Sequence, residues 1–176
     1  MNQNIKKISI IGGSGTGKTT LAINLSKELE LPSYHIDAIN YSDNWEKRDK
    51  SIRDKEILEI VKEEKWIIDG TYKDTLKSRL ENADLIVYLD YTSLSQVVGV
   101  LKRYFKYKGK DRPENPGCKE RMNKEFLFWV INWRKNKRDN VIKELMGIDK
   151  SKVLIFKNRR KLNKWYYKNF NKKMEI

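Results

Sequence analysis

The chain has 176 residues, of which 39% are hydrophobic, and a formal net charge of +14 at pH 7. This length suits one domain with its own core and is too short for two ordinary domains. No apolar run approaches the ~20 residues that span a bilayer, and the first residues lack the apolar stretch of a signal peptide. Cys118 is the only cysteine, which excludes an intramolecular disulfide and a multi-cysteine metal cluster. We therefore expect a cytoplasmic protein.

The positive charge is concentrated in the second half of the chain. Residues 1–90 hold 14 Lys and Arg against 16 Asp and Glu, whereas residues 91–176 hold 24 against 8. Such asymmetry indicates an anionic partner, which would be phosphate groups, a polynucleotide or a membrane surface. A general abundance of Lys and Asn along the chain is the alternative explanation.

Short apolar runs alternate with helical patterns along the chain. The runs predict strands at 6–11, 33–36, 66–68, 85–89 and 153–156. Apolar residues at helical spacing follow each run, and a polar stretch with Gly and Pro at 108–117 interrupts the longest helical region. Short strands that alternate with helices predict a parallel sheet covered on both faces. The fold class is therefore α/β and doubly wound.

The strongest motif lies between the first strand and the first helix. Residues 12–19 read GGSGTGKT and match G-x-x-x-x-G-K-[ST] without a gap. Glycines let backbone N–H groups turn toward phosphate, and the next helix adds its unpaired donors. We expect Lys18 to reach the β- and γ-phosphates of ATP and Thr19 to ligate Mg²⁺. The nucleotide-binding set is Gly12, Gly13, Ser14, Gly15, Thr16, Gly17, Lys18, Thr19 and Thr20.

Three later strands each end in a carboxylate, at the sheet edge where α/β proteins bind ligands. Asp69 follows an apolar strand and is the expected Mg²⁺-associated acid, with a loop-capping role as the alternative. Asp37 is expected either to accept a proton from a substrate hydroxyl or to bind the acceptor. Period-two alternation places His35 on the same side as Asp37, and we interpret His35 mainly as a structural residue. Asp90 precedes Thr92-Ser93 and is expected to cap the next helix.

Basic residues of the second half provide further phosphate-binding candidates. Arg103 and Arg112 flank a polar stretch that could close over a triphosphate, and guanidinium groups bind two phosphate oxygens at once. Solvated surface is the alternative for both. Residues 157–173 hold eight Lys and Arg among Trp165, Tyr166, Tyr167 and Phe170. This pattern fits single-stranded nucleic acid, but we favour an amphipathic last helix whose aromatic residues pack on the sheet.

An ordered set of segments resembles the adenylate-kinase-like P-loop proteins and, more closely, the FlaR-type "DNA topology modulation protein" family. The set includes the phosphate loop, YHID at 34–37, WIIDGTY at 66–72, and Arg112-Pro113 with Cys118 before the aromatic stretch at 126–129. The resemblance covers nearly the whole chain. It implies a single domain over 1–176 with strand order 2-3-1-4-5, an acceptor-binding insert at about 38–75 and a flap at about 104–117.

The same resemblance implies roles for individual residues. Lys18 would stabilise the transferred phosphoryl group, Asp69 would organise Mg²⁺, and Arg159 would lie near the adenine. Arg103 and Arg112 would be the flap arginines. Adenylate kinases continue the Asp-Gly of the third strand with an aromatic residue, Pro and Arg, whereas this chain continues with Thr71-Tyr72-Lys73. This departure argues against a nucleoside monophosphate as acceptor, since lysine lacks the two-pronged geometry of arginine.

The preferred hypothesis is an Mg-ATP-dependent kinase that phosphorylates a small molecule, with Lys18, Asp37, Arg103 and Arg112 as its catalytic residues. Two alternatives remain open: an ATP-regulated nucleic-acid-binding protein that uses the basic half, and a P-loop protein that binds or hydrolyses ATP without kinase turnover. A membrane partner is not expected in any of the three.

Overall fold

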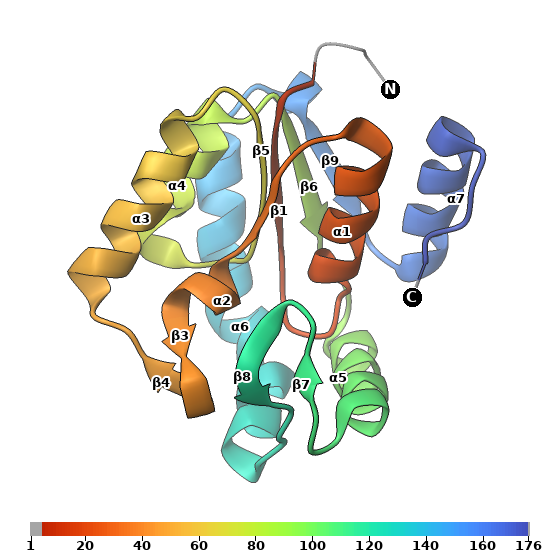
Figure 1. The fold of residues 1–176 in the computed structure, drawn as a ribbon. Coiled ribbons are helices and arrows are strands. Elements are labelled where there is room, and N and C mark those ends of the chain that lie inside the picture. The colour runs from red at the N-terminus through yellow and green to blue at the C-terminus, as the bar shows by residue number, and fades with distance from the viewer. Residues whose placement is uncertain (1–4, 176) are drawn as a thin grey trace.

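A computed structural model describes residues 5–175 and places a five-stranded sheet at the centre of the molecule (Figure 1). All neighbouring strands are parallel, and their order is β2-β5-β1-β6-β9. The strands are β1 (Lys7–Gly12), β2 (Ser33–His35), β5 (Trp66–Asp69), β6 (Leu85–Leu89) and β9 (Val153–Phe156). In chain order this is 2-3-1-4-5, so the predicted fold class and strand order are both confirmed.

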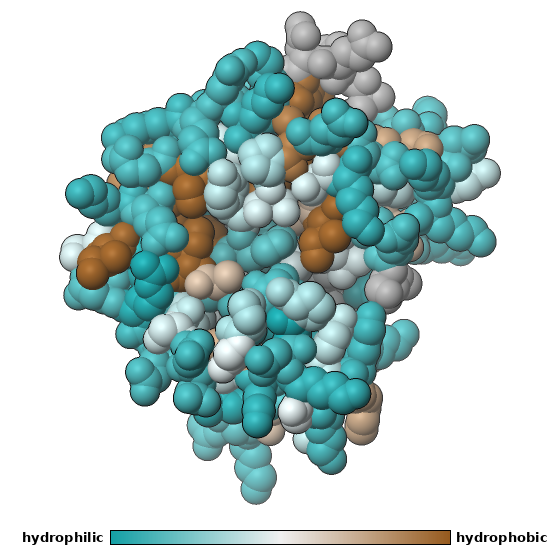
Figure 2. Space-filling view, viewed as in Figure 1, coloured by the Kyte–Doolittle hydropathy of each residue, from teal (hydrophilic) through white to brown (hydrophobic). Residues whose placement is uncertain are grey.

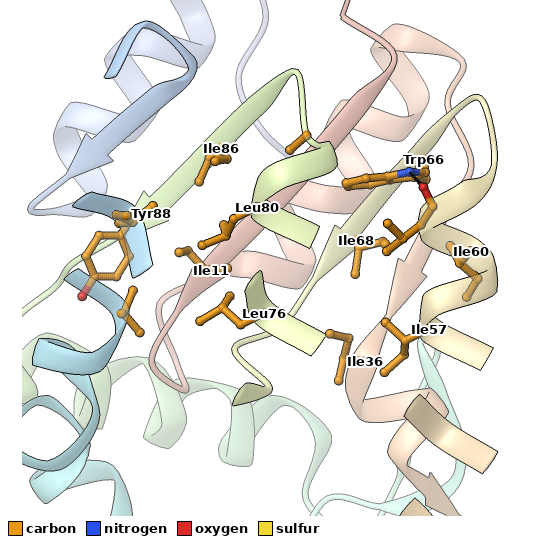
Figure 3. Close-up of a cluster of buried hydrophobic side chains, with 14 of the residues drawn as sticks. Ile11, Ile36, Ile57, Ile60, Trp66, Ile68, Leu76, Leu80, Ile86 and Tyr88 are labelled. Carbon is orange, nitrogen blue, oxygen red and sulfur yellow. Dashed lines mark hydrogen bonds between the residues drawn. The ribbon is translucent and has the colours of Figure 1, made fainter. Parts of the chain in front are cut away.

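Helices cover both faces of the sheet, as parallel strands require. One face is covered by α1 (Lys18–Leu29) and α7 (Arg159–Phe170), and the other by α3 (Lys50–Lys62), α4 (Lys73–Asn82) and α6 (Lys124–Met146) (Figure 1). Successive strand residues point to opposite faces. Ile10 and Ile67 therefore pack under α1 and α7, whereas Ile11 and Ile68 join the cluster on the other face (Figure 3).

The remaining elements gather beyond the carboxyl ends of the strands, at the bottom of Figure 1. After β2 the chain forms α2 (Ile36–Asn40), β3 (Tyr41–Ser42), the 3₁₀ turn η1 (Asp43–Trp45) and β4 (Glu46–Lys47). After β6 it forms α5 (Ser93–Tyr107) and a hairpin of β7 (Asp111–Arg112) and β8 (Asn115–Lys119). A second 3₁₀ turn, η2 (Lys150–Lys152), precedes β9 on the chain. Residues 104–117, the expected flap, are thus the end of α5 and most of this hairpin.

The face of the molecule seen in Figure 2 is strongly polar. Figure 2 shows a face that is mostly hydrophilic, on which hydrophobic residues form small separate groups. Among the helices of residues 5–175, none combines the length and the apolarity needed to cross a bilayer.

Candidate active site

The phosphate loop connects β1 to α1, as its motif predicts. Gly15 and Gly17 have φ values of 75° and 89°, which side-chain-bearing residues rarely adopt, and Gly17 caps the amino end of α1. Gly15 is also required for space, because a Cβ atom there would lie 2.3 Å from the backbone carbonyl oxygen of Gln96 on α5. Helix α5 therefore packs against the back of the loop and supports its shape.

Lys18 begins α1 and folds back over the loop. Its Nζ donates a hydrogen bond to the carbonyl oxygen of Gly13 at 2.9 Å, and the Thr16 hydroxyl donates to the same oxygen at 2.8 Å. Burial lowers the pKa of Lys18, while the nearby carboxylates of Asp69 and Asp37 act in the opposite direction. The lysine and the two acids therefore belong to one site. Thr19 and Thr20 lie half-buried in the first turn of α1.

Asp69 ends β5 beside this loop and has one carboxylate oxygen free. Its Oδ1 lies 3.3 Å from His35 Nδ1, but its Oδ2 is buried and has no hydrogen-bond partner among the described residues. A buried oxygen without a partner is costly, and carboxylate oxygens are preferred ligands of Mg²⁺. Asp69 therefore suits a cation that arrives with a ligand. Within residues 5–175 no three His, Cys, Asp or Glu side chains form a metal cluster, so further ligands would be hydroxyl, phosphate or water oxygens.

His35 contacts Asp69, and the predicted alternation between His35 and Asp37 is wrong. Strand β2 ends at His35 and α2 begins at Ile36, so period two no longer applies to Asp37. Burial disfavours protonation of His35, but the adjacent Asp69 carboxylate outweighs this effect and the pKa of His35 is raised. Asp37 instead lines the cavity described below.

The turn after β5 is fixed by two residues that the sequence analysis missed. The Arg79 guanidinium is fully buried and donates to the carbonyl oxygens of Gly70 at 2.9 Å and Tyr72 at 3.0 Å. Burial lowers the pKa of Arg79 to about 9, opposed by the charge of Asp69. The Thr71 hydroxyl accepts from Gly12 N at 2.8 Å and donates to Gly12 O at 2.9 Å. Arg79 falls on the apolar face of α4, which is the one sequence signal that could have revealed it.

A cavity of about 360 Å³ extends from the phosphate loop to the elements at the bottom of Figure 1. Its lining holds four basic, four aromatic and two acidic side chains. Its lining residues are Ser14, Asp37, Tyr41, Trp45, Lys47, Arg103, Arg112, Glu120, Arg121, Asn123, Phe126 and Trp129. Three of the four predicted catalytic residues, Asp37, Arg103 and Arg112, thus face the same space, next to the loop that carries the fourth.

Glu120 holds the two cavity arginines together. Arg103 Nε lies 3.1 Å from Glu120 Oε1, and Arg112 Nε lies 3.1 Å from Glu120 Oε2. Burial and the charge of Arg112 lower the pKa of Arg103, which Glu120 opposes. Both arginines engage Glu120 through Nε, so its carboxylate fixes their positions. No local pattern indicates this role, because Glu120 is one of several acids in a stretch of mixed charge.

Arg159 contacts the phosphate loop from the other side. It is the first residue of α7, and its Nη2 donates to the carbonyl oxygen of Gly15 at 3.4 Å. A Cβ atom on Gly17 would also lie 3.6 Å from this nitrogen. The residue expected near the adenine therefore lies beside the phosphate loop.

Asp90 is not a helix cap, in contrast to the prediction. The cap of α5 is Thr92, whose hydroxyl accepts from Ser95 N at 3.3 Å. The Asp90 carboxylate is fully buried and binds Arg134 at 2.8 Å, Arg138 at 3.1 Å and Lys157. The prediction failed because these partners come from α6 and from Lys157, just after β9, far away along the chain.

The last helix supports the amphipathic interpretation of the basic tail. Trp165, Tyr166 and Phe170 pack into the core under α1 and α7, and only Tyr167 is largely exposed, at 53%. Tyr166 is thus buried in the core and Trp165 and Phe170 are partly buried against it, as an amphipathic last helix requires.

Comparison with known proteins supports the fold. No protein-family model matches the chain. The uncharacterized protein YqaC of Bacillus subtilis (strain 168) is 34% identical over 132 residues, which cover 71% of each chain. Shikimate kinase from Acinetobacter baumannii, solved in complex with shikimate, has a TM-score of 0.59 and 20% identity over 97% of both chains. Shikimate kinase from Bacteroides thetaiotaomicron has a TM-score of 0.56 and 17% identity over 96% of this chain and 99% of its own. The chain has the fold of P-loop kinases.

Proposed function

The chain belongs to the family of the uncharacterized protein YqaC, and we propose that it is an Mg-ATP-dependent phosphotransferase that acts on a small molecule. One observation carries this proposal: a single cavity joins Ser14 of the phosphate loop to Asp37, with Arg103 and Arg112 on its wall. A phosphoryl donor on the loop and an acceptor beside Asp37 would therefore share one cavity. The kinase fold of the neighbours supports the same reaction class.

In this proposal the chain contributes positioning, charge and a proton acceptor. Residues 12–20 would bind the phosphates of ATP, and Arg159 would steady the loop from outside. The acceptor hydroxyl oxygen would form a bond to the γ-phosphorus while the bond to the β–γ bridging oxygen breaks. Asp37 would take the hydroxyl proton, and ADP would leave. Lys18, Arg103 and Arg112 would neutralise the charge on the transferred group.

Thr19 and Asp69 would hold the Mg²⁺ that accompanies ATP, for which the free Oδ2 of Asp69 is suited. Such an ion neutralises charge on the phosphate oxygens. The proposal also retains a single domain over 1–176, with an acceptor-binding insert at 38–75 and a flap at 104–117. It places the protein in the cytoplasm, where ATP is supplied. We also propose that the chain is a FlaR-type protein, a family assignment that does not change the mechanism described above.

The decisive test is acceptor-dependent turnover. The purified protein is incubated with Mg-ATP and a panel of nucleosides, nucleoside monophosphates, sugars and hydroxy acids, and ADP and phosphorylated product are measured together. We expect one acceptor class to give equal amounts of both. Lys18→Ala should lower the rate at least ~100-fold, because a charge that meets the developing negative charge is lost.

Lys27→Ala provides the matched control, since Lys27 lies exposed on the same helix and its one ion pair within residues 5–175 is with Glu175. This variant should keep the full rate. Full turnover by Lys18→Ala would remove Lys18 from the mechanism. ATP binding without any acceptor-dependent ADP would overturn the kinase proposal in favour of a nucleotide-binding role.

A further inference from the structure

Four aromatic side chains line the cavity outside the phosphate loop. Tyr41 and Trp45 come from the insert after β2, and their ring centroids lie 5.5 Å apart at an interplanar angle of 69°. Phe126 and Trp129 come from the first turns of α6, and their rings are nearly parallel, with centroids 6.0 Å apart. Trp129 is 43% exposed. Large rings that stay partly exposed in a concave site are typical of surfaces that a ligand covers.

The backbone at Trp45 is strained. Asn44 and Trp45 have φ values of 58° and 64°, so two successive non-glycine residues adopt the left-handed region. Contacts from the β7–β8 hairpin keep this conformation: Trp45 Nε1 donates to Lys119 O at 2.8 Å, and the Arg112 guanidinium carbon lies 5.2 Å from the Trp45 ring centroid. Strained backbone held by its surroundings is characteristic of functional positions.

The cavity also carries cations that its own acids do not neutralise. Arg103 and Arg112 are held by Glu120. Lys47 and Arg121 are exposed at the cavity, and neither forms an ion pair within residues 5–175. Asp37 is the remaining acid, so the side chains that line the cavity carry a net positive charge when no ligand is bound. An acceptor with a negative group of its own would form ion pairs with Lys47 and Arg121.

We propose that the acceptor is a flat, unsaturated ring compound that carries an anionic group in addition to the hydroxyl that is phosphorylated. This inference rests on the proposed phosphotransferase function. The ring contacts the aromatic side chains of the insert and α6, Lys47 and Arg121 bind the anionic group, and Asp37 takes the hydroxyl proton. The reaction consumes one ATP and yields ADP, the phosphate ester and the proton on Asp37.

The test distinguishes the effect of a flat ring from the effect of a negative charge by comparing related compounds. The flat pair is 4-(hydroxymethyl)benzoate and benzyl alcohol, and the saturated pair is 4-(hydroxymethyl)cyclohexanecarboxylate and cyclohexylmethanol. A nucleoside and its 5′-monophosphate form a second flat pair, which distinguishes a nucleobase from a carbocyclic ring. Binding is followed by quenching of tryptophan fluorescence, because Trp45 and Trp129 face the cavity, and turnover is followed by ADP release.

We expect the flat anions to bind at least ~10-fold more tightly than the saturated anion and than their own neutral partners, since stacking and charge each contribute about that factor. Trp45→Ala should lower the affinity for flat compounds ~10-fold more than it lowers the affinity for the saturated anion. Arg121→Ala should lower the affinity for anions and spare neutral compounds. Tyr167→Ala and Lys164→Ala, on the exposed face of α7, are the matched controls and should change neither.

The outcomes distinguish this inference from the function on which it rests. Equal binding of flat and saturated anions, or no binding of any flat anion, overturns the inference. Equal rates of ADP release with saturated and with flat acceptors also overturn the inference, while the kinase proposal stands. Tight binding of a flat anion without any ADP release supports the ligand class and overturns phosphoryl transfer.

Discussion

Asp69 has one carboxylate oxygen without a hydrogen-bond partner in the described part of the chain, beside the loop that would bind ATP. An amide at this position keeps the shape but removes the charge that a cation needs. Asp69→Asn should therefore raise the Mg²⁺ concentration for half-maximal activity at least ~10-fold, as loss of a charged ligand costs more than 1.4 kcal/mol. A magnesium titration of turnover at saturating ATP measures this shift.

Asp37→Asn is the comparison for that titration, because Asp37 faces the acceptor end of the cavity. We expect it to lower the maximal rate and leave the magnesium midpoint in place. An unchanged midpoint in Asp69→Asn would contradict the assignment of Asp69 to the metal.

Asp90 makes a different contribution, to stability and its dependence on pH. Burial would raise the pKa of Asp90, but hydrogen bonds and charges of Arg138, Lys157 and Arg134 outweigh this effect and lower it. A carboxyl whose folded pKa lies below its unfolded value of about 3.9 stabilises the fold above that pH, and this contribution disappears as pH falls through the folded pKa. The protein should therefore lose stability below about pH 4.

Asp90→Asn tests this contribution. We expect a loss of about 1–3 kcal/mol in the free energy of unfolding at pH 7, where the charged hydrogen bonds are strongest, and a smaller difference from wild type at pH 3. Urea unfolding at both pH values gives the two differences. Asp139→Asn is the control, since Asp139 touches Arg138 at 3.8 Å but its side chain is 91% exposed. Equal losses at both pH values would contradict the linkage.

At the scale of elements, the phosphate loop depends on close packing against α5. A Cβ atom on Gly99 would lie 1.9 Å from the carbonyl oxygen of Gly15, and one on Gly15 would lie 2.3 Å from Gln96 O. Glycine in a helix normally costs about 1 kcal/mol relative to alanine. Here the backbone contact reverses that preference, because the side chain would enter the loop.

Gly99→Ala should therefore destabilise the protein by about 1–3 kcal/mol, the usual cost of overpacking, and weaken ATP binding as the loop shifts. Thermal unfolding with and without Mg-ATP measures both effects. Gly147→Ala, where the nearest atom lies 3.7 Å from the added Cβ, should leave both unchanged. A stabilised Gly99→Ala protein with normal ATP affinity would show that the loop does not depend on this contact.

The elements also show what the sequence could and could not predict. The five sheet strands and the loop were predictable because buried apolar runs and glycine spacing are local signals. The switch from strand to helix at Ile36 was missed, since an apolar residue fits both states. Local patterns predict a polar loop in place of the β7–β8 hairpin and a helix cap in place of the buried ion pairs of Asp90. Both depend on contacts between residues that local patterns do not connect.

At the scale of the whole molecule, the insert and the hairpin meet over the carboxyl ends of the sheet (Figure 1). Besides the Trp45–Lys119 hydrogen bond, Cys118 Sγ donates to Ser42 O at 3.2 Å. Gly117, with φ 78°, packs so close to Asp43 that a Cβ atom would lie 2.1 Å from its carboxylate. The two segments roof the cavity, so we expect them to separate when substrates enter and products leave.

Cys118 reports on this separation without any engineered probe. It is the only cysteine in the sequence, and it is 1% exposed at the contact between hairpin and insert. A thiol reagent should label the native protein on the order of 100-fold more slowly than the urea-unfolded chain, since labelling requires local opening. Trp45→Ala removes a hydrogen bond and a cation–π contact, worth about 1–2 kcal/mol together, and should speed labelling roughly tenfold. The Tyr167→Ala control should label at the native rate. Labelling of the native protein at the unfolded rate would mean that the roof is already open, and a rate unchanged by Trp45→Ala would mean that Trp45 does not hold it closed.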